Sequence, residues 1–202
     1  MACVAGNPFG GKEAGRNGKK LATANLGPEM ERPPGRDGIG TARILVLGIG
    51  NPIRRDDGAG LHVVRRLRQE GLPPGVDALE VIGGWTALLD RLGECDRLIV
   101  VDAVDAGLPA GSVVDLDPAA TRPGAKSPLA GGHSLDLGEA LALAGTLGLP
   151  RPSTVRVVGI QAEDLSSFSE ECSPSVAASI GEACARVRSL LAEMGRGRRL
   201  DP

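Results

Sequence analysis

Residues 44–58 read Ile-Leu-Val-Leu-Gly-Ile-Gly-Asn-Pro-Ile-Arg-Arg-Asp-Asp-Gly, an apolar run that passes through two glycines into a polar turn. A short apolar run without polar alternation is typical of a parallel strand that is buried on both faces. A helix is predicted to begin at Asp57 or Gly58, directly after this turn. It carries its apolar side chains on one side, at Leu61, Val64 and Leu67. A buried strand, a turn and a helix in this order predict an α/β fold.

The same alternation continues along the chain. Further strands are predicted at residues 79–82, 97–101, 112–116 and 155–159, and further helices at residues 86–92 and 134–147. A last helix is predicted to begin at Pro174, with Ser173 as its N-cap. Its apolar stripe consists of Val176, Ile180, Ala183, Val187, Leu190 and Met194. Five strands alternating with helices predict a three-layer sandwich, in which helices cover both faces of a mostly parallel sheet.

One strand is expected to run against the others. Only residues 102–111 separate the third and fourth predicted strands, and this link has no evident helix. A connection between parallel neighbours needs about a dozen residues or more. The fourth strand is therefore predicted to be antiparallel, within a sheet of five strands.

The ends of the chain differ in composition from this domain. Residues 1–41 are rich in Gly, Pro, Lys, Arg and Asn and show no strand or helix periodicity, so they are predicted to form a disordered tail. Met30 offers an alternative translation start within this tail. Residues 42–195 are predicted to form one domain, and residues 196–202 a short Arg-rich, solvated tail.

Composition argues against several classes of function. The 23 basic and 25 acidic residues nearly balance, at a formal charge of −2, and the chain has one Trp, two Phe and no Tyr. Neither feature favours binding to nucleic acid. No apolar run reaches the ~20 residues of a membrane span, and no secretory signal is evident, so a cytoplasmic protein is expected. The four cysteines, Cys3, Cys95, Cys172 and Cys184, are widely spaced and are expected to be thiols in a reducing compartment.

Two carboxylates and an imidazole are predicted to meet at one end of the sheet. Asp57 follows the first strand, Asp102 follows the third, and His133 precedes the helix at residues 134–147. That helix is ~20 Å long and ends just before the fifth strand, so its start should lie at the end where the parallel strands finish. Open α/β sheets bind their ligands at this end. The position of His133 depends on the antiparallel fourth strand.

These three side chains would provide two oxygen donors and one nitrogen donor, with positions left for water or substrate. The donor types leave Zn, Ni, Mn, Fe and Co open. Such a metal acts as a Lewis acid or lowers the pKa of a bound water. Each residue also has a structural interpretation, because an Asp at a helix start is often only a cap. His62 is expected to be a surface or packing residue. The arginines of the first helix region are expected to form a solvated face rather than a docking patch; they are Arg54, Arg55, Arg65, Arg66 and Arg68.

A dinucleotide site is a weaker alternative. Gly48 and Gly50 follow a strand, but Ile53 stands where the third glycine of G-x-G-x-x-G belongs. The helix also begins several residues too late to bind a pyrophosphate at its N-terminus.

Four segments together resemble the hydrogenase maturation endopeptidases. They are the stretch from Gly48 to Gly60 with Gly-x-Gly-Asn and Asp-Asp-Gly, the run Val-Val-Asp-Ala-Val around Asp102, His133, and Val-Gly-Ile-Gln at residues 158–161. The resemblance covers residues 43 to about 194 in order. It implies a five-stranded sheet with one antiparallel strand, as the connections also predict.

The resemblance also implies a function. It predicts an endopeptidase, of the aspartic type, that removes the C-terminal extension of a NiFe-hydrogenase large-subunit precursor after nickel has been loaded. Asp57, Asp102 and His133 match the family's metal-contacting residues, so they are the predicted catalytic and nickel-binding residues. The nickel would come with the substrate rather than stay bound to this chain. Four further residues would shape the site: Gly48, Gly50, Asn51 and Asp56. A non-catalytic chaperone that checks the same precursor for nickel is the alternative.

Overall fold

The structure, a computed structural model, describes residues 43–82, 91–116 and 137–196. The chain divides into two units, Met1–Gly38 and Ile39–Pro202, and every described residue lies in the second. The predicted tail at residues 1–41 and most of the predicted helix at residues 86–92 lie outside the described residues. The last six residues of the predicted C-terminal tail also lie outside them.

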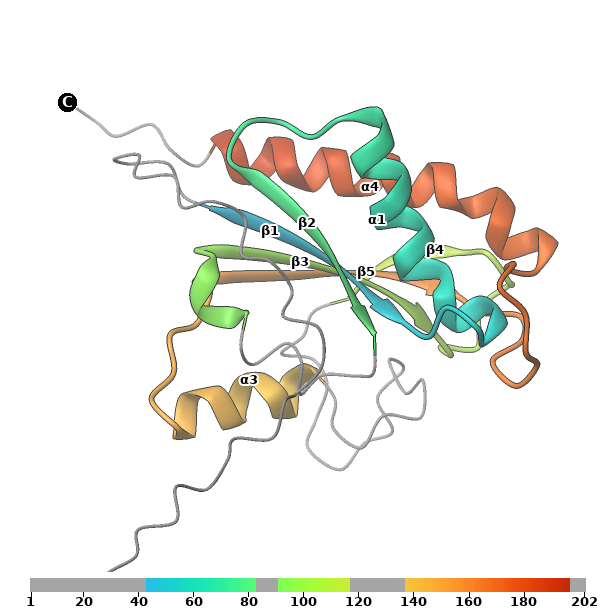
Figure 1. Cartoon of the computed structure of the whole chain (residues 1–202), viewed down its shortest axis with the longest axis horizontal. Helices are drawn as coiled ribbons and strands as arrows, with labels where there is room; N and C mark the ends of the chain where they lie inside the picture. Colours follow the sequence, from blue (N-terminus) through green and yellow to red (C-terminus); the bar gives the residue numbers. More distant parts are fainter. Residues whose placement is uncertain (1–42, 83–90, 117–136, 197–202) are drawn as a thin grey trace, which may run out of the picture. The chain divides into compact units, whose positions relative to one another are not determined.

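Five strands form one sheet in the order β2-β1-β3-β5-β4 (Figure 1). Their bounds are Ile44–Gly50 for β1, Val76–Ile82 for β2, Arg97–Val104 for β3, Val113–Leu116 for β4 and Thr154–Gln161 for β5. The pairs β1–β2, β1–β3 and β3–β5 are parallel, and β4 is antiparallel to β5. The predicted mostly parallel sheet with an antiparallel fourth strand is confirmed.

Helices cover both faces of the sheet. α1 (Ala59–Glu70) and α4 (Pro174–Arg196) pack side by side on one face, and α3 (Leu137–Thr146) lies on the other (Figure 1). Two short 3-10 helices complete the described elements, η1 (Arg55–Gly58) before α1 and η2 (Leu92–Glu94) before β3. This arrangement is the predicted three-layer α/β sandwich.

The core consists of two clusters separated by the sheet, because successive side chains of a strand point to opposite faces. In β1, Val46 contributes to the cluster beneath α1 and α4, and Leu47 to the cluster beneath α3. All seven residues of β1 are buried, as expected for a parallel strand that is covered on both sides. The deep burial of β1 fixes the position of the turn that follows it.

The predicted apolar stripe of the last helix is also confirmed. Its six residues are all buried against the sheet: Val176, Ile180, Ala183, Val187, Leu190 and Met194. No helix among the described residues is both long and apolar enough to cross a lipid bilayer.

The third strand is longer than predicted. The prediction ends it at residue 101, directly before the charged Asp102, but β3 continues to Val104. Asp102 pairs with Gly159 of β5, and Val104 pairs with Gln161. Backbone pairing with a long neighbouring strand therefore outweighs the polarity of one side chain. Asp102 lies inside the strand rather than after it, still in the half toward the carboxyl end.

Two glycines let η1 and α1 approach the sheet at backbone contact distance. A Cβ atom on Gly48 would lie less than 3.0 Å from the carbonyl of Gly60 in α1. A Cβ atom on Gly60 would lie less than 3.0 Å from the carbonyl oxygens of Ile49 and Val101. The start of α1 thus lies directly above the junction of β1 and β3.

We expect Gly60→Ala to lower the free energy of unfolding by about 3 kcal/mol, because backbone atoms cannot move aside for the methyl group. Gly195→Ala is the matched control. Gly195 also lies in a helix, but a Cβ atom there would have no atom of the described residues within 4 Å. In that open space, alanine is expected to stabilise the protein by about 0.5–1 kcal/mol. Urea unfolding of both variants measures the difference, and equal effects would contradict the close packing.

Candidate active site

Asp57 and Asp102 lie together where the strand order reverses. From β1, the chain passes through α1 to β2 on one side, and then crosses to β3 on the other side. Asp57 is in η1, which contacts both β1 and β3, and Asp102 is in β3. The carboxyl ends of β1 and β3 therefore bring both side chains to the topological switch point, the usual ligand site of such sheets.

Both carboxylates are almost fully buried, with 1% of Asp57 and 2% of Asp102 exposed. Burial raises the pKa of Asp102 well above its ordinary value, and the nearby charge of Asp57 raises it further. A hydrogen bond with the backbone of Ala103 acts in the opposite direction but is the weakest of the three influences. Asp102 therefore tends to hold a proton.

One oxygen of Asp102 is buried without a hydrogen bond. Oδ2 has no hydrogen-bond partner among the residues that the structure describes. Such atoms are rare in native proteins and often mark a functional site. A carboxylate oxygen in this state can bind a metal ion or carry a proton. Asp102 is therefore chemically suited both to metal binding and to proton transfer.

The third predicted ligand, His133, lies outside the described residues, which include neither 117–136 nor 83–90. Within the described part of the chain, no group of three or more His, Cys, Asp or Glu side chains is arranged to hold a metal ion. The structure thus brings together the two predicted carboxylates, and the position of His133 stays a prediction.

Asp56, the neighbour of Asp57, anchors a loop. Its fully buried carboxylate accepts hydrogen bonds from the backbone N–H of Glu163 at 2.9 Å and of Asp164 at 2.8 Å. It also accepts hydrogen bonds from the backbone N–H of Ser173 at 2.6 Å and from the Ser173 hydroxyl at 2.9 Å. Asp56 therefore ties the loop between β5 and α4 to the turn that carries Asp57.

Ser173 also stands where its N-cap was predicted, directly before the helix that begins at Pro174. Its carbonyl accepts the first hydrogen bond of the helix, from the Ala177 N–H at 2.8 Å. Its hydroxyl donates to Asp56, a contact that the sequence did not predict.

The remaining predicted site-shaping residues form the turn beneath Asp57. Asn51 Oδ1 accepts a hydrogen bond from the Ile53 N–H at 3.1 Å, and the Asn51 carbonyl accepts one from the Arg54 N–H at 3.1 Å. Gly50 has a φ of 152°, and a Cβ there would collide with the carbonyl of Asp57. The turn therefore needs glycine at position 50 and a short hydrogen-bonding side chain at position 51.

Gln161 is a buried polar residue whose role could not be read from the sequence. Its Oε1 accepts hydrogen bonds from the backbone N–H of Ala106 at 2.8 Å and of Leu108 at 3.2 Å. Its Nε2 donates to the Ala162 carbonyl at 3.0 Å. Gln161 thus fixes the loop after β3, a few residues beyond Asp102. In the sequence, Gln161 is recognisable only as a single polar residue at the end of a buried apolar strand. It belongs to the Val-Gly-Ile-Gln segment of the family resemblance, but that segment does not reveal its hydrogen-bond partners.

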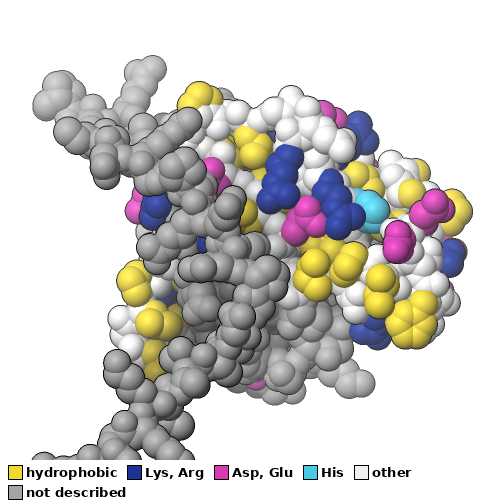
Figure 2. All heavy atoms as spheres, in the orientation of Figure 1, with side chains coloured by type: hydrophobic (Ala, Val, Ile, Leu, Met, Phe, Trp, Pro, Cys, Tyr) yellow, Lys and Arg dark blue, Asp and Glu magenta, His cyan; other side chains and the backbone are white. Residues whose placement is uncertain are grey.

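The arginines of the first helix region form ion pairs instead of an uninterrupted basic patch. Arg65 and Arg68 pair with Glu80, and Arg66 pairs with Glu70. Figure 2 shows basic and acidic side chains mixed on this face. The prediction of a solvated face fits this neutralised surface better than a docking site for an acidic partner.

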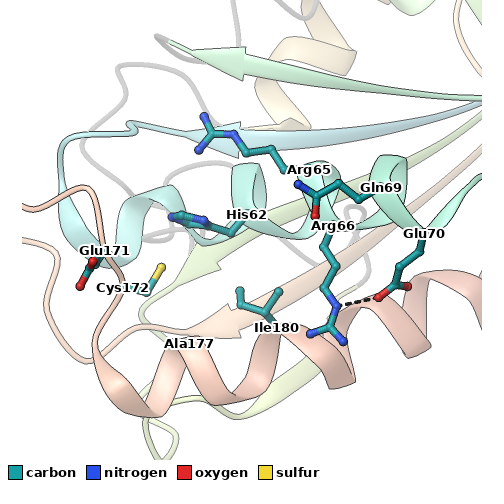
Figure 3. A pocket seen from close by; sticks show the side chains of 9 residues that line it. All are labelled: His62, Arg65, Arg66, Gln69, Glu70, Glu171, Cys172, Ala177 and Ile180. Atoms are coloured by element: carbon teal, nitrogen blue, oxygen red, sulfur yellow. Dashed lines mark hydrogen bonds and ion pairs between the residues drawn. The ribbon is translucent and has the colours of Figure 1, made fainter.

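A groove of about 600 Å³ runs between α1 and α4, outside the carboxylate site (Figure 3). His62 lies on its α1 wall, and Glu171 and Cys172 lie on the segment that precedes α4. The His62 ring Nε2 is 3.2 Å from the Glu170 carbonyl, and the side chain is half-buried. Burial raises the pKa of Cys172 to about 11, which keeps the thiol protonated and unsuited to nucleophilic catalysis.

The chain is similar in sequence to known proteins. A family model described as hydrogenase maturation protease matches residues 61–189. The hydrogenase expression/formation protein HupD of Thiocapsa roseopersicina is 34% identical over 157 residues, which cover 75% of this chain and 69% of that protein. HupD of Rhodobacter capsulatus is 35% identical over 154 residues, covering 74% and 72% of the two chains.

Solved structures show the same similarity. The hydrogenase maturating endopeptidase HybD from Escherichia coli superimposes with a TM-score of 0.62 at 31% identity, covering 76% of this chain and 94% of that one. The NiFe-hydrogenase maturation protease HycI from Thermococcus kodakarensis gives a TM-score of 0.57 at 27% identity, covering 77% and 93%. The five-stranded sheet and its helices therefore match those of proteins named as maturation proteases.

Proposed function

Because the chain belongs to the hydrogenase maturation protease family, we propose that it is an endopeptidase that removes the C-terminal extension of a NiFe-hydrogenase large-subunit precursor. The observation that carries this proposal is the buried pair of Asp57 and Asp102 at the switch point of the sheet. Burying two adjacent carboxyl groups costs folding free energy unless they bind a ligand or share a proton, so such a pair often marks a functional site.

The nickel of the precursor is the ligand that we propose for this pair. Asp57 and Asp102 would each offer carboxylate oxygen, and His133 is the predicted third donor. The unpartnered Oδ2 of Asp102 supports this assignment, because it has the burial and the donor chemistry that a metal ligand needs. Nickel carried in by the substrate would place the scissile bond beside the two carboxyl groups, and the same residues would reject a precursor without metal.

The two carboxyl groups also suit the proton transfers of peptide hydrolysis, and we assign the enzyme to the aspartic type on this basis. Burial and the nearby charge of Asp57 raise the pKa of Asp102, which favours its protonated form beside the Asp57 carboxylate. One carboxylate can then accept a proton from the attacking water while the other carboxyl group donates a proton to the leaving amine.

We place this reaction in the cytoplasm. The described cysteines form no disulfide, which is in keeping with a reducing compartment. The expected partner is the large-subunit precursor, and neither nucleic acid nor a membrane is part of the proposed reaction.

Intact-mass spectrometry of the precursor tests the proposed function. We expect the wild-type protein to shorten the nickel-loaded precursor by one C-terminal peptide, and to leave the nickel-free precursor uncut. A nickel-loaded precursor that stays at full mass while it forms a stable complex would instead support the nickel-checking chaperone. Cleavage of both precursors at the same rate would contradict the nickel requirement alone.

A further inference from the structure

Among the residues that the structure describes, one aromatic side chain is strongly exposed near the candidate active site. Phe168, in the loop between β5 and α4, is 81% exposed, and Ile53, before η1, is 51% exposed. Both residues lie on segments at the end of the sheet where β1 and β5 finish (Figure 1). Single exposed apolar side chains are common, but neighbouring ones held beside a candidate active site can contribute to protein–protein contact.

The loop that carries Phe168 is held in place. The Ser169 N–H donates to the Ile53 carbonyl at 3.0 Å, and the Arg55 N–H donates to the Ser169 carbonyl at 2.8 Å. At the other end of the loop, the Asp164 carboxylate accepts hydrogen bonds from the backbone of Ser166 and Ser167. Asp56 fixes both flanks of the same loop, at residues 163–164 and 173. The exposure of Phe168 is therefore imposed by the fold, and little ordering entropy would be lost on binding.

Acidic side chains lie beside this apolar point. Glu170 and Glu171 are both exposed, and residues 162–173 include no Lys or Arg. Their carboxylates form no hydrogen bond or ion pair with any residue in the described ranges 43–82, 91–116 and 137–196. Arg54 and Arg55, which follow Ile53, are half-buried, and Arg55 pairs with Asp164 at 3.8 Å. Glu171 also lies at the rim of the groove between α1 and α4 (Figure 3). Figure 2 shows acidic and basic side chains close to hydrophobic ones at this end of the described surface.

This surface is connected through Asp56 to the turn that carries the proposed catalytic residue Asp57. Asp56 holds the Phe168 loop, and its immediate neighbour Asp57 is one of the two buried acids. Any polypeptide that contacts both Ile53 and Phe168 therefore lies next to the turn that presents Asp57.

We propose that Ile53, Phe168, Glu170 and Glu171, here called the Phe168 surface, bind the large-subunit precursor outside its nickel site. The segment that docks there presents an apolar side chain next to Lys or Arg, which matches the apolar point and its acidic flank. This identification of the binding partner rests on the proposed function, because the precursor is the substrate of that reaction. The Phe168 surface then contributes to substrate selection by protein contact, in addition to nickel.

Cleavage kinetics and binding together test this inference, with the nickel-loaded precursor as the probe. Phe168→Ala is expected to raise KM about 10- to 50-fold, and Phe168→Leu to restore most of the loss. Glu170→Lys combined with Glu171→Lys is expected to raise KM at low salt and to reverse the sign of its salt dependence, because repulsion replaces attraction. Leu147→Ala is the matched control, because Leu147 is 61% exposed but follows α3 at the other end of the sheet.

The precursor's affinity for the same variants, measured by surface plasmon resonance in the Asp102→Asn background, should fall in parallel with the rise in KM. An unchanged KM and affinity in Phe168→Ala would overturn the Phe168 surface while leaving the peptidase function intact. Failure of the wild-type protein to cleave would contradict the proposed function, and the binding measurement would still decide the role of Phe168.

Discussion

The Asp102→Asn protein is expected to fold, to exceed the wild type in stability at neutral pH, and to release peptide about 10²–10⁴-fold more slowly. Asparagine keeps the shape of the side chain but cannot ionise or transfer the proton. The loss of rate follows from the proposed role of Asp102 in the reaction. The gain in stability follows from its burial beside Asp57.

The pH dependence of this gain has a defined sign. Since the pKa of Asp102 is raised in the folded state, the unfolded chain loses its proton first as the pH rises. Asp102 therefore lowers the stability of the wild type increasingly above about pH 4, where an unfolded aspartate ionises. Asp102→Asn removes this penalty, so its advantage in unfolding free energy should be small at pH 4 and should grow as the pH rises to 8.

Asp115→Asn provides a control of opposite sign. Arg186 donates hydrogen bonds to the Asp115 carboxylate and lowers its pKa. The ionised form of Asp115 therefore stabilises the folded state above about pH 4, and its loss should cost about 0.5 kcal/mol, because the pair is largely exposed to solvent. Urea unfolding between pH 4 and 8 compares the two variants. Equal pH profiles for wild type and Asp102→Asn would contradict the raised pKa.

The Asp56→Ala protein is expected to lose about 4 kcal/mol or more of unfolding free energy, enough to unfold many domains of this size. The substitution leaves three backbone N–H groups and the Ser173 hydroxyl without their buried acceptor. Each buried donor without a partner costs about 1–3 kcal/mol, although water entering the space will reduce the sum. Chemical denaturation followed by circular dichroism measures the loss.

Two milder variants keep this prediction testable if Asp56→Ala does not fold. Ser173→Ala removes only one of the four hydrogen bonds and should cost about 1 kcal/mol. Asp164→Ala removes a carboxylate that also accepts several hydrogen bonds, but on a solvent-facing loop where water can replace it, so it should destabilise the protein much less than Asp56→Ala. If Asp56→Ala were no more destabilising than Asp164→Ala, Asp56 would not be the anchor of the loop.

Much of the fold could be predicted because the chain obeys simple connection rules. The short link between β3 and β4 is too small for a parallel crossover, and β4 is indeed antiparallel. The apolar spacing in α4 correctly identified the side chains that pack on the sheet. The location of Asp57 and Asp102 followed from strand direction alone, since carboxyl ends of parallel strands share one edge.

Other features depend on contacts between distant segments, which local patterns do not encode. Asp102 lies inside β3 because the partner strand β5 extends past it. The four hydrogen bonds of Asp56 come from residues 163–173, more than 100 positions away. Gln161 likewise bonds the backbone of a loop about 55 residues earlier. A buried polar side chain at a strand or helix end is the sequence signal that such anchors share, but it does not name their partners.

Peptide release from the nickel-loaded precursor by Asp57→Ala, Asp102→Ala and His133→Ala tests the central claim most directly. All three variants are expected to lose release while they remain folded, and His62→Ala, which replaces the other histidine of the chain, is expected to keep its kcat. Wild-type rates in folded Asp57→Ala or Asp102→Ala would contradict the assignment of the buried carboxylate pair as the active site.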